Sequence, residues 1–181
     1  MESISIDEFF SFLDRRKGKL DGVVICGGEP CFSDGLIEFI SKIKEKGYSV
    51  KLDTNGSFPD VLLKLINDKL IDYVAMDIKY YPFSKYGKFE NKIKESIKLI
   101  INSGVEHEFR TTVVPNVLGK EDIINIAKSL QGAKRYYLQQ FRNEGCINKD
   151  FEKIKPYTKD EMEDFYNSIK EYFDKCSLRN I

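Results

Sequence analysis

The sequence predicts an α/β protein with a parallel sheet, and three observations support this fold class. Five short apolar segments alternate with amphipathic helical segments along the chain. Residues 23–25 and 73–76 are apolar on both faces, as in parallel strands that helices cover. Each apolar segment ends in a polar or glycine-rich cluster, and barrels of parallel strands carry their chemistry at these strand ends.

The five strands are predicted at residues 21–26, 48–53, 72–78, 106–114 and 135–141. A helix-containing crossover of ordinary βαβ length separates each strand from the next, which favours parallel pairing. No linker or low-complexity stretch divides the chain. Residues 1–181 are therefore predicted to form a single domain.

Capping residues predict where the helices begin. The segments 5–8 and 158–161 read Ser-Ile-Asp-Glu and Thr-Lys-Asp-Glu, and each is a capping box for the first or the last helix. Ser33 or Asp34 is expected to cap the second helix, and Pro59 is expected to open the third. The glycines expected to stop helices are Gly47, Gly104 and Gly132.

The charge balance gives no electrostatic reason to expect nucleic acid or an anionic membrane as a partner. The 181 residues include 29 Lys and Arg and 29 Asp and Glu, so the formal net charge is zero. No apolar run approaches the roughly 20 residues that cross a bilayer. No leader pattern opens the chain, and we expect a cytoplasmic protein.

The cysteines and the single histidine do not predict a metal site by themselves. Cys26 and Cys31 depart from the usual C-x2-C spacing, and Cys146 and Cys176 lie far from them in the sequence. A small buried or loop role is favoured for each cysteine. His107 falls within a predicted strand, where a structural role is favoured.

The first polar cluster is Gly27-Gly28-Glu29-Pro30, directly after the first predicted strand. The glycines allow a ligand to approach the backbone, Glu29 adds a carboxylate, and Pro30 fixes the chain direction. Together they suit a small ammonium group. The same residues are also typical of a tight strand-to-helix turn.

The next two clusters also have a functional and a structural interpretation. Asp53-Thr54-Asn55-Gly56 offers oxygens to a ligand hydroxyl or a hard cation, or forms an Asx turn before the next helix. Met76-Asp77-Ile78-Lys79 places an acid and a base at a strand end, where they hold the two charged groups of an amino acid or pair with each other.

The last two strands end in polar groups as well. Arg110 begins the run Arg-Thr-Thr-Val-Val-Pro inside an apolar strand, and burying an arginine is costly without an anionic partner. The partner is either a bound ligand or an ion pair inside the barrel. Gln139, Gln140 and Arg142 end the fifth strand with amides and a cation. The common placement of these clusters predicts one shared binding site.

The motifs GGEP, DTNG, MDIK and RTTVVP occur in this order at βα spacing, and the chain thereby resembles the radical S-adenosylmethionine superfamily. The pair MDIK and RTTVVP is similar to enzymes that activate glycyl radical enzymes, of the anaerobic ribonucleoside-triphosphate reductase or pyruvate formate-lyase type. The resemblance extends from about Ile4 to the C-terminus. It implies a partial (β/α) barrel.

The resemblance also implies cofactors and partners. S-adenosylmethionine and a 4Fe-4S cluster would generate a 5′-deoxyadenosyl radical under anaerobic conditions, and this radical would abstract a hydrogen from a glycine of the partner enzyme. Flavodoxin or ferredoxin would donate the electron. No catalytic side chain is identified in the chain itself.

The resemblance further implies site residues by matching position. Gly28 and Glu29 would hold the methionyl ammonium, and Thr112 and Gln139 would lie near the adenosine and its ribose. The full set implied for S-adenosylmethionine is Gly27, Gly28, Glu29, Pro30, Asp53, Asp77, Lys79, Arg110, Thr112 and Gln139. The set implied for a monovalent cation is Asp53, Thr54, the Met76 carbonyl and Asp77.

One departure from the family pattern is that no CxxxCxxC motif occurs in the sequence, and iron–sulfur clusters need thiolate ligands. We therefore expect that the chain lacks the first family strand and its cluster loop, and that it is inactive alone as a radical enzyme. The strand at residues 21–26 would then be an open edge, left uncovered or paired with another copy.

Two other functions remain open. The chain is also compatible with a non-catalytic module that binds S-adenosylmethionine, a nucleotide or a protein. A relative of 7-carboxy-7-deazaguanine synthase would share the GGEP motif, although MDIK and RTTVVP argue against it.

Overall fold

The computed structural model describes residues 3–181 and forms one six-stranded sheet in the order β1-β2-β3-β4-β5-β6. The strands are β1 (Gly22–Ile25), β2 (Ser49–Thr54), β3 (Tyr73–Asp77), β4 (Glu106–Val113), β5 (Arg135–Gln140) and β6 (Lys175–Arg179). All neighbouring strands pair in parallel. The predicted α/β class with a parallel sheet is confirmed, and the open sheet agrees with a partial barrel.

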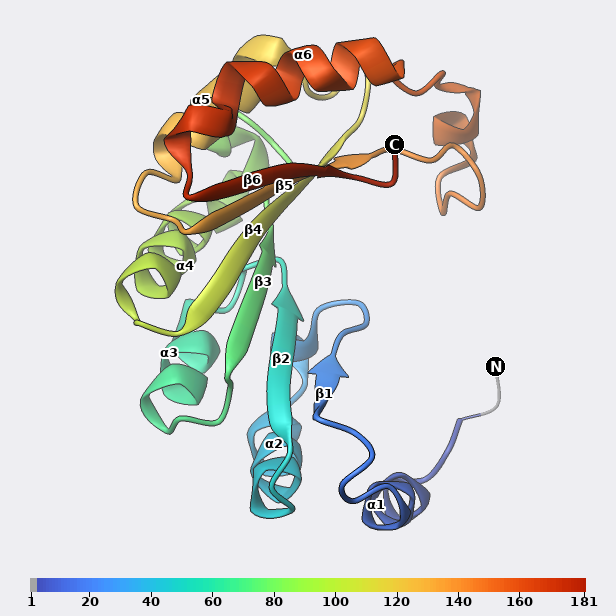
Figure 1. The fold of residues 1–181 in the computed structure, drawn as a ribbon, viewed down its shortest axis with the longest axis vertical. Helices are drawn as coiled ribbons and strands as arrows, with labels where there is room; N and C mark the ends of the chain where they lie inside the picture. Colours follow the sequence, from blue (N-terminus) through green and yellow to red (C-terminus); the bar gives the residue numbers. More distant parts are fainter. Residues whose placement is uncertain (1–2) are drawn as a thin grey trace.

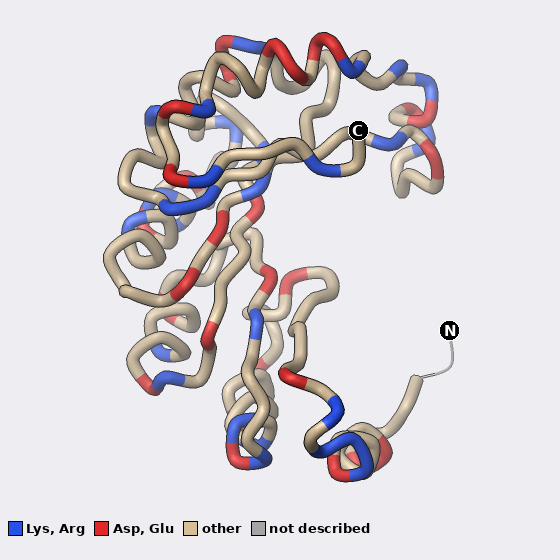
Figure 2. The backbone as a smooth tube through the Cα atoms, viewed as in Figure 1, with Lys and Arg blue, Asp and Glu red and all other residues tan. Residues whose placement is uncertain are grey.

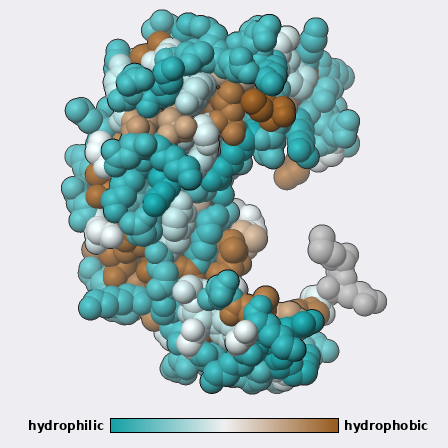
Figure 3. All heavy atoms as spheres, in the orientation of Figure 1, coloured by the Kyte–Doolittle hydropathy of each residue, from teal (hydrophilic) through white to brown (hydrophobic). Residues whose placement is uncertain are grey.

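The helices lie mainly on one face of this sheet. They are α1 (Ile6–Arg15), α2 (Leu36–Glu45), α3 (Pro59–Asn67), α4 (Glu90–Asn102), α5 (Lys120–Ser129) and α6 (Lys159–Ile169). Short 3-10 helices are η1 (Pro30–Phe32), η2 (Phe83–Phe89), η3 (Lys149–Lys153) and η4 (Lys170–Tyr172). Helices α2 to α6 cover the outer face, and the strongly twisted sheet curves around an open hollow (Figure 1). The space-filling view shows the same hollow in a C-shaped molecule (Figure 3).

Strand alternation separates the core from the hollow. Leu52, Val74 and Phe109 point toward the helices and are fully buried. Their neighbours in sequence, such as Asp53 and Arg110, point to the opposite face, because successive side chains of a strand alternate in direction. The hydrophobic core therefore lies between the sheet and the helices, and charged side chains of the middle strands point to the side of the hollow.

The sequence predicted five strands, and the structure has a sixth at Lys175–Arg179. The sixth strand pairs in parallel with β5, from Arg135 with Lys175 to Gln139 with Arg179. It was missed because the segment is short, lies at the sheet edge and carries charged residues at both ends, which weakens an apolar strand pattern.

Most of the predicted helix starts are confirmed. Ser5 and Thr158 form capping boxes with Glu8 and Glu161. Pro59 is the first residue of α3. The predicted cap of α2 by Ser33 or Asp34 is wrong, because these residues precede the N-cap position, which Gly35 takes without a side-chain hydrogen bond. The 3-10 turn η1 moves the helix start along the chain.

Strand β1 forms one edge of the sheet. Within residues 3–181 it pairs with β2 alone, and the Val24 side chain is exposed. The expected open edge is confirmed for this part of the chain, while pairing with another copy stays a prediction. None of the helices in residues 3–181 is long and apolar enough to cross a membrane.

Candidate functional site

The polar ends of β2 and β3 meet at one arginine of β4 on the hollow side of the sheet. Arg110 Nη1 donates a hydrogen bond to Asp53 Oδ2 at 3.0 Å, and its Nε donates to Asp77 Oδ1 at 2.8 Å. The register of β3 and β4 places Asp77 directly opposite Arg110. Three predicted site residues therefore form one cluster, and the predicted ion pairing inside the barrel is confirmed.

Arg110 keeps its charge in this cluster. Its side chain is 12% exposed, and burial by itself would lower the pKa of the guanidinium. The hydrogen bonds and charges of Asp77 and Asp53 outweigh burial and raise the pKa above its ordinary value. A charged, partly desolvated guanidinium beside the ends of β2 and β3 suits the binding of a carboxylate.

A second ion pair adjoins Arg110 on the same face of the sheet, and it was not predicted. Arg179 of β6 donates two hydrogen bonds of 2.9 Å to the buried Glu108, and the Tyr73 hydroxyl donates a third, also of 2.9 Å. The guanidinium of Arg179 stacks on the Tyr137 ring at 3.4 Å. Glu108 Oε1 also lies 3.9 Å from Arg110 Nη1, so the two ion pairs are connected. Acidic and basic segments lie side by side along the middle strands in Figure 2.

Glu108 stays ionised despite its burial. Desolvation would raise the pKa of this carboxyl, but the hydrogen bonds from Arg179 and Tyr73 and the nearby positive charges lower it below its usual value. Glu108 and Arg110 thus both favour their charged forms on this face of the sheet.

Glu29 links the first two strand ends. Its carboxylate accepts hydrogen bonds from Thr54 Oγ1 at 2.7 Å, from the Asn55 amide at 2.6 Å and from the Cys31 amide at 3.2 Å. The tight-turn interpretation of Gly27-Gly28-Glu29-Pro30 is therefore correct in part, since Glu29 caps the turn that Pro30 begins. The same bonds fix the carboxylate beside the end of β2.

The two glycines before Glu29 leave room for a ligand. Gly27 has φ of 143°, a conformation that side chains rarely allow. A Cβ added at Gly27 or Gly28 would meet no atom within 4 Å. The space beside this backbone is open, as the binding of an ammonium group requires.

The segment after β2 forms the predicted Asx turn. Asn55 Oδ1 accepts a hydrogen bond from the Ser57 amide at 2.9 Å, and Thr54 Oγ1 accepts one from the Gly56 amide at 3.0 Å. Gly56 has φ of 77°, and a Cβ there would collide with the Met76 methyl carbon. The turn thus packs directly on the buried end of β3.

Two cavities adjoin these strand ends and share Lys79 and Tyr80. One, of about 400 Å³, is bounded by Glu29 and by aromatic residues that include Phe58. The other, of about 170 Å³, is bounded by Asp77, Thr112 and Phe151 among others. Lys79 thus stands between Glu29 and Asp77.

Several predicted residues border neither of these two cavities. Gln139 borders neither cavity, but the register of β4 and β5 places it opposite Thr112. Asp53 and Arg110 also border neither, because they pair with each other on the face of the sheet. Met76 is fully buried, and its side chain faces the core.

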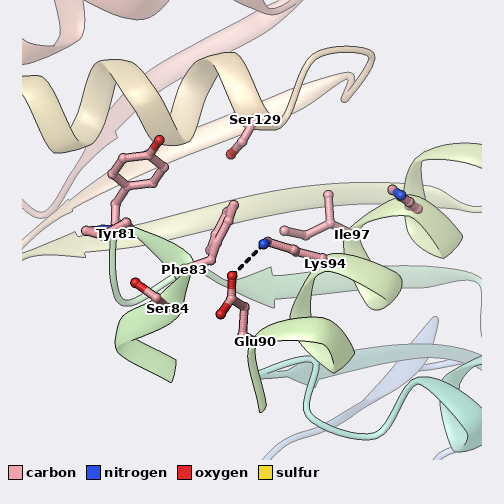
Figure 4. Close-up of a pocket in the computed structure, with 9 residues that line it drawn as sticks. Tyr81, Phe83, Ser84, Glu90, Lys94, Ile97 and Ser129 are labelled. Carbon is pink, nitrogen blue, oxygen red and sulfur yellow. Dashed lines mark hydrogen bonds and ion pairs between the residues drawn. The ribbon is translucent and has the colours of Figure 1, made fainter. Parts of the chain in front are cut away.

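A further pocket of about 440 Å³ lies between η2 and α4, away from the predicted site residues. Figure 4 shows Tyr81 and Phe83 of this pocket, with the Glu90–Lys94 ion pair at its rim. None of the predicted cofactor residues borders it. It is therefore not a candidate for the same ligand.

Among the cysteines and the histidine, Cys31 and His107 are buried, and Cys176 lies in strand β6. Cys31 is buried, and burial, followed by the charge of Glu29, raises the pKa of its thiol to about 12. Cys26 is exposed, and Cys146 and Cys176 lie elsewhere. His107 is buried, with Nδ1 2.9 Å from the Val105 carbonyl. Residues 3–181 contain no group of three His, Cys, Asp or Glu side chains arranged to hold a metal, so these cysteines do not fit a 4Fe-4S cluster.

Comparison with known proteins gives relatives along almost the whole chain. A candidate glycyl-radical enzyme activating enzyme of Methanocaldococcus jannaschii is 38% identical over 189 residues, covering 98% of this chain and 78% of the relative. A second protein of that name in the same organism is 32% identical over 121 residues, covering 62% of this chain and 46% of the relative. The 7-carboxy-7-deazaguanine synthase of this organism is 28% identical over 140 residues, covering 72% of this chain and 54% of the synthase.

Solved structures support the fold. Streptococcus suis SuiB bound to S-adenosylmethionine has a TM-score of 0.75 at 14% identity, covering 99% of this chain and 44% of SuiB. Archaeal TYW1 has a TM-score of 0.63 at 18% identity, covering 93% of this chain and 58% of TYW1. The chain therefore spans less than two thirds of either structure. No protein-family model matches the sequence.

The first relative decides the family, because its identity of 38% extends over 98% of this chain and 78% of its own length. The solved structures agree with it, since the chain has the same partial-barrel fold as SuiB. The chain belongs to the glycyl-radical enzyme activating family of the radical S-adenosylmethionine superfamily.

Proposed function

We propose that this chain binds S-adenosylmethionine at the carboxyl ends of its strands and acts in the formation of a glycyl radical on a partner enzyme. The observation that carries the proposal is the meeting of Asp53, Asp77 and Arg110 beside an open glycine turn. This arrangement occurs in a chain 38% identical to a candidate activating enzyme.

The glycine turn and Glu29 suit the ammonium group of the methionyl moiety. The backbone at Gly27 and Gly28 is open on the ligand side. Glu29 already accepts three hydrogen bonds, and a carboxylate offers about four acceptor positions, so it can accept another from an ammonium. This part of the site would set the position of the sulfonium group.

The positively charged residues suit the other end of the ligand. Lys79 stands between the two cavities and can reach a carboxylate in either of them. Arg110 presents a charged guanidinium at the same edge. Thr112 and Gln139, opposite each other on β4 and β5, would contact the adenosine and its ribose.

S-adenosylmethionine, when bound and reduced by one electron, supplies a 5′-deoxyadenosyl radical that can take a hydrogen atom from a glycine. The cysteines of this chain do not fit the cluster that would donate this electron. We therefore assign to these residues the binding and orientation of S-adenosylmethionine, and no step of electron transfer.

The proposed partner is a glycyl radical enzyme of the anaerobic ribonucleotide reductase or pyruvate formate-lyase type, with flavodoxin or ferredoxin as electron donor. The hollow on this side of the molecule is open in the space-filling view (Figure 3). SuiB, which shares the fold, has been solved with its precursor peptide SuiA. A polypeptide segment carrying the glycine would enter this chain from the side of the hollow.

Calorimetric titration with S-adenosylmethionine, under anaerobic conditions, tests the proposal. We expect binding by the unaltered chain and at least tenfold weaker binding by Asp77→Asn or Lys79→Met, since each loses about one charge-assisted hydrogen bond. Glu106→Gln is the matched control, because Glu106 lies on the same face but at the opposite end of β4, paired with Arg135. No binding by the unaltered chain would defeat the proposal.

A second candidate function rests on the 28% identity to 7-carboxy-7-deazaguanine synthase. That match covers 72% of the chain, against 98% for the activating enzyme, and is less favoured for this reason. Titration with a carboxylated pterin separates the two. Tight pterin binding would favour the synthase-like function, and its absence together with S-adenosylmethionine binding favours the activating enzyme.

A further inference from the structure

The residues predicted for a monovalent cation already have partners within the chain. Asp53 Oδ2 and Asp77 Oδ1 both accept from Arg110. Thr54 Oγ1 donates to Glu29 and accepts from the Gly56 amide. A hard cation needs several free oxygen ligands, and the three side-chain oxygens named above would have to give up their present partners to become ligands. As they are paired, these side chains do not fit an alkali-metal ion.

One oxygen of this group stays without a hydrogen bond. Asp53 Oδ1 is buried and has no hydrogen-bond partner within the part of the chain that the structure describes. The nearest opposite charge is Lys51 Nζ, 3.2 Å away, on the same face of β2. The Lys51 ammonium also lies 5.8 Å from the centre of the Tyr73 ring, so an aromatic face stabilises it in this place.

The charges around this oxygen balance. The acids are Asp53, Asp77 and Glu108, and the bases that pair with them are Lys51, Arg110 and Arg179. Contacts of 2.8 to 3.9 Å connect all six side chains into one network. Neutral as a whole, the network has no surplus negative charge to attract a metal ion.

We propose that Lys51 and Arg110 act as built-in cations in place of an alkali-metal ion, so that the strand ends are charge-balanced without K⁺ or Na⁺. Lysine is suited to this role because its ammonium is a compact point charge of the same sign and magnitude. Tethering also keeps the ammonium at high effective concentration beside Asp53, which a free ion reaches only at high salt. The expected binding of S-adenosylmethionine in different salts rests on the proposed function, whereas the charge replacement itself does not.

Thermal unfolding in different salts tests the inference without any ligand. The chain is unfolded in KCl, NaCl and choline chloride at equal ionic strength, because an ion that binds the folded state raises the midpoint. We expect midpoints within about 1 °C of one another for the unaltered chain, and a rise of about 2 °C or more in KCl or NaCl for Lys51→Met, whose Asp53 is left without its ammonium.

Lys44→Met is the matched control. Lys44 also pairs with an aspartate, Asp72, at 2.7 Å, but on the outer surface. Its loss should lower the midpoint equally in all three salts. A higher midpoint of the unaltered chain in KCl or NaCl than in choline chloride would overturn the inference. Equal midpoints of Lys51→Met in all salts would overturn the role of Lys51.

Calorimetry adds the ligand and separates the two proposals. Binding of S-adenosylmethionine by the unaltered chain should change less than twofold between potassium and choline buffers, and a loss of fivefold or more in choline would contradict the inference. If S-adenosylmethionine binds in neither buffer, the proposed function fails, while the unfolding experiment still decides whether Lys51 replaces the ion.

Discussion

The two faces of the same sheet differ in what their side chains do. On the helix face, Leu52, Val74 and Phe109 are fully buried in an apolar core. On the hollow face, their neighbours Asp53 and Arg110 are paired charges. Each strand thus contributes alternately to both faces, because its side chains point in opposite directions.

This difference separates stability from binding. Burial of apolar side chains stabilises a fold strongly, whereas a buried ion pair contributes little net free energy after its desolvation. The charged network of Glu108, Arg110 and Arg179 is therefore poorly explained by stability alone. Arg110 of this network lies beside the ends of β2 and β3, and this location favours a role in binding a charged ligand.

The largest effect is expected on the helix face. Phe109→Ala should lower the free energy of unfolding by about 3–5 kcal/mol, because it leaves a cavity in the core where Phe109 is fully buried. Urea unfolding followed by circular dichroism measures it. A loss below 1 kcal/mol would show that the helix face is not the main source of stability.

A smaller loss of stability is expected at the centre of the hollow face. Arg110→Gln leaves Asp53 and Asp77 without their shared base and should cost about 2 kcal/mol of unfolding free energy, less than for a fully buried pair because Arg110 is partly exposed. Binding of S-adenosylmethionine should weaken at least tenfold. Arg110→Lys, which keeps the charge, should recover part of both quantities in urea unfolding and calorimetry.

The pH dependence of stability should change at Glu108. Because its pKa is lowered below 4.5 in the folded chain, its stabilising contribution is complete above pH 4.5 and is lost as the pH falls through the lowered value. Glu108→Gln should cost about 1 kcal/mol at neutral pH. It should also show a shallower loss of stability in acid, measured by urea unfolding from pH 7 to pH 3. If the unfolding free energies of the two proteins fell equally between pH 7 and pH 3, that result would argue against an ionised Glu108.

The smallest effect on stability is expected at Thr112, on the hollow face of the strand that carries Phe109. Its side chain is exposed, so Thr112→Ala should change the unfolding free energy by no more than about 0.5 kcal/mol. Weaker S-adenosylmethionine binding by this variant, with unchanged stability, would sharpen the contrast between the two faces. A large loss of stability would break it.

Local patterns in the sequence were enough to predict most of the fold. The capping boxes at Ser5 and Thr158 and the apolar strands depend on residues close together in the sequence, and the structure confirms them. The gathering of Asp53, Asp77 and Arg110 followed from one general rule, that parallel strands end at the same edge.

Contacts that depend on the exact register of strands could not be predicted in this way. The pair Glu108–Arg179 joins positions 71 residues apart, and it depends on the register of β4, β5 and β6. The sixth strand did leave a weak signal. Lys175, Ser177 and Arg179 alternate with Cys176 and Leu178, which is a period-two pattern that a helix would not produce.

The tight contact between Gly56 and Met76 has a consequence for the end of strand β3. Any side chain at position 56 would collide with the Met76 methyl group, and Met76 directly precedes Asp77 in β3. The bare backbone of this turn thus leaves the room that the end of the buried Met76 side chain occupies. A side chain introduced at position 56 would have to displace that methionine, one residue from Asp77.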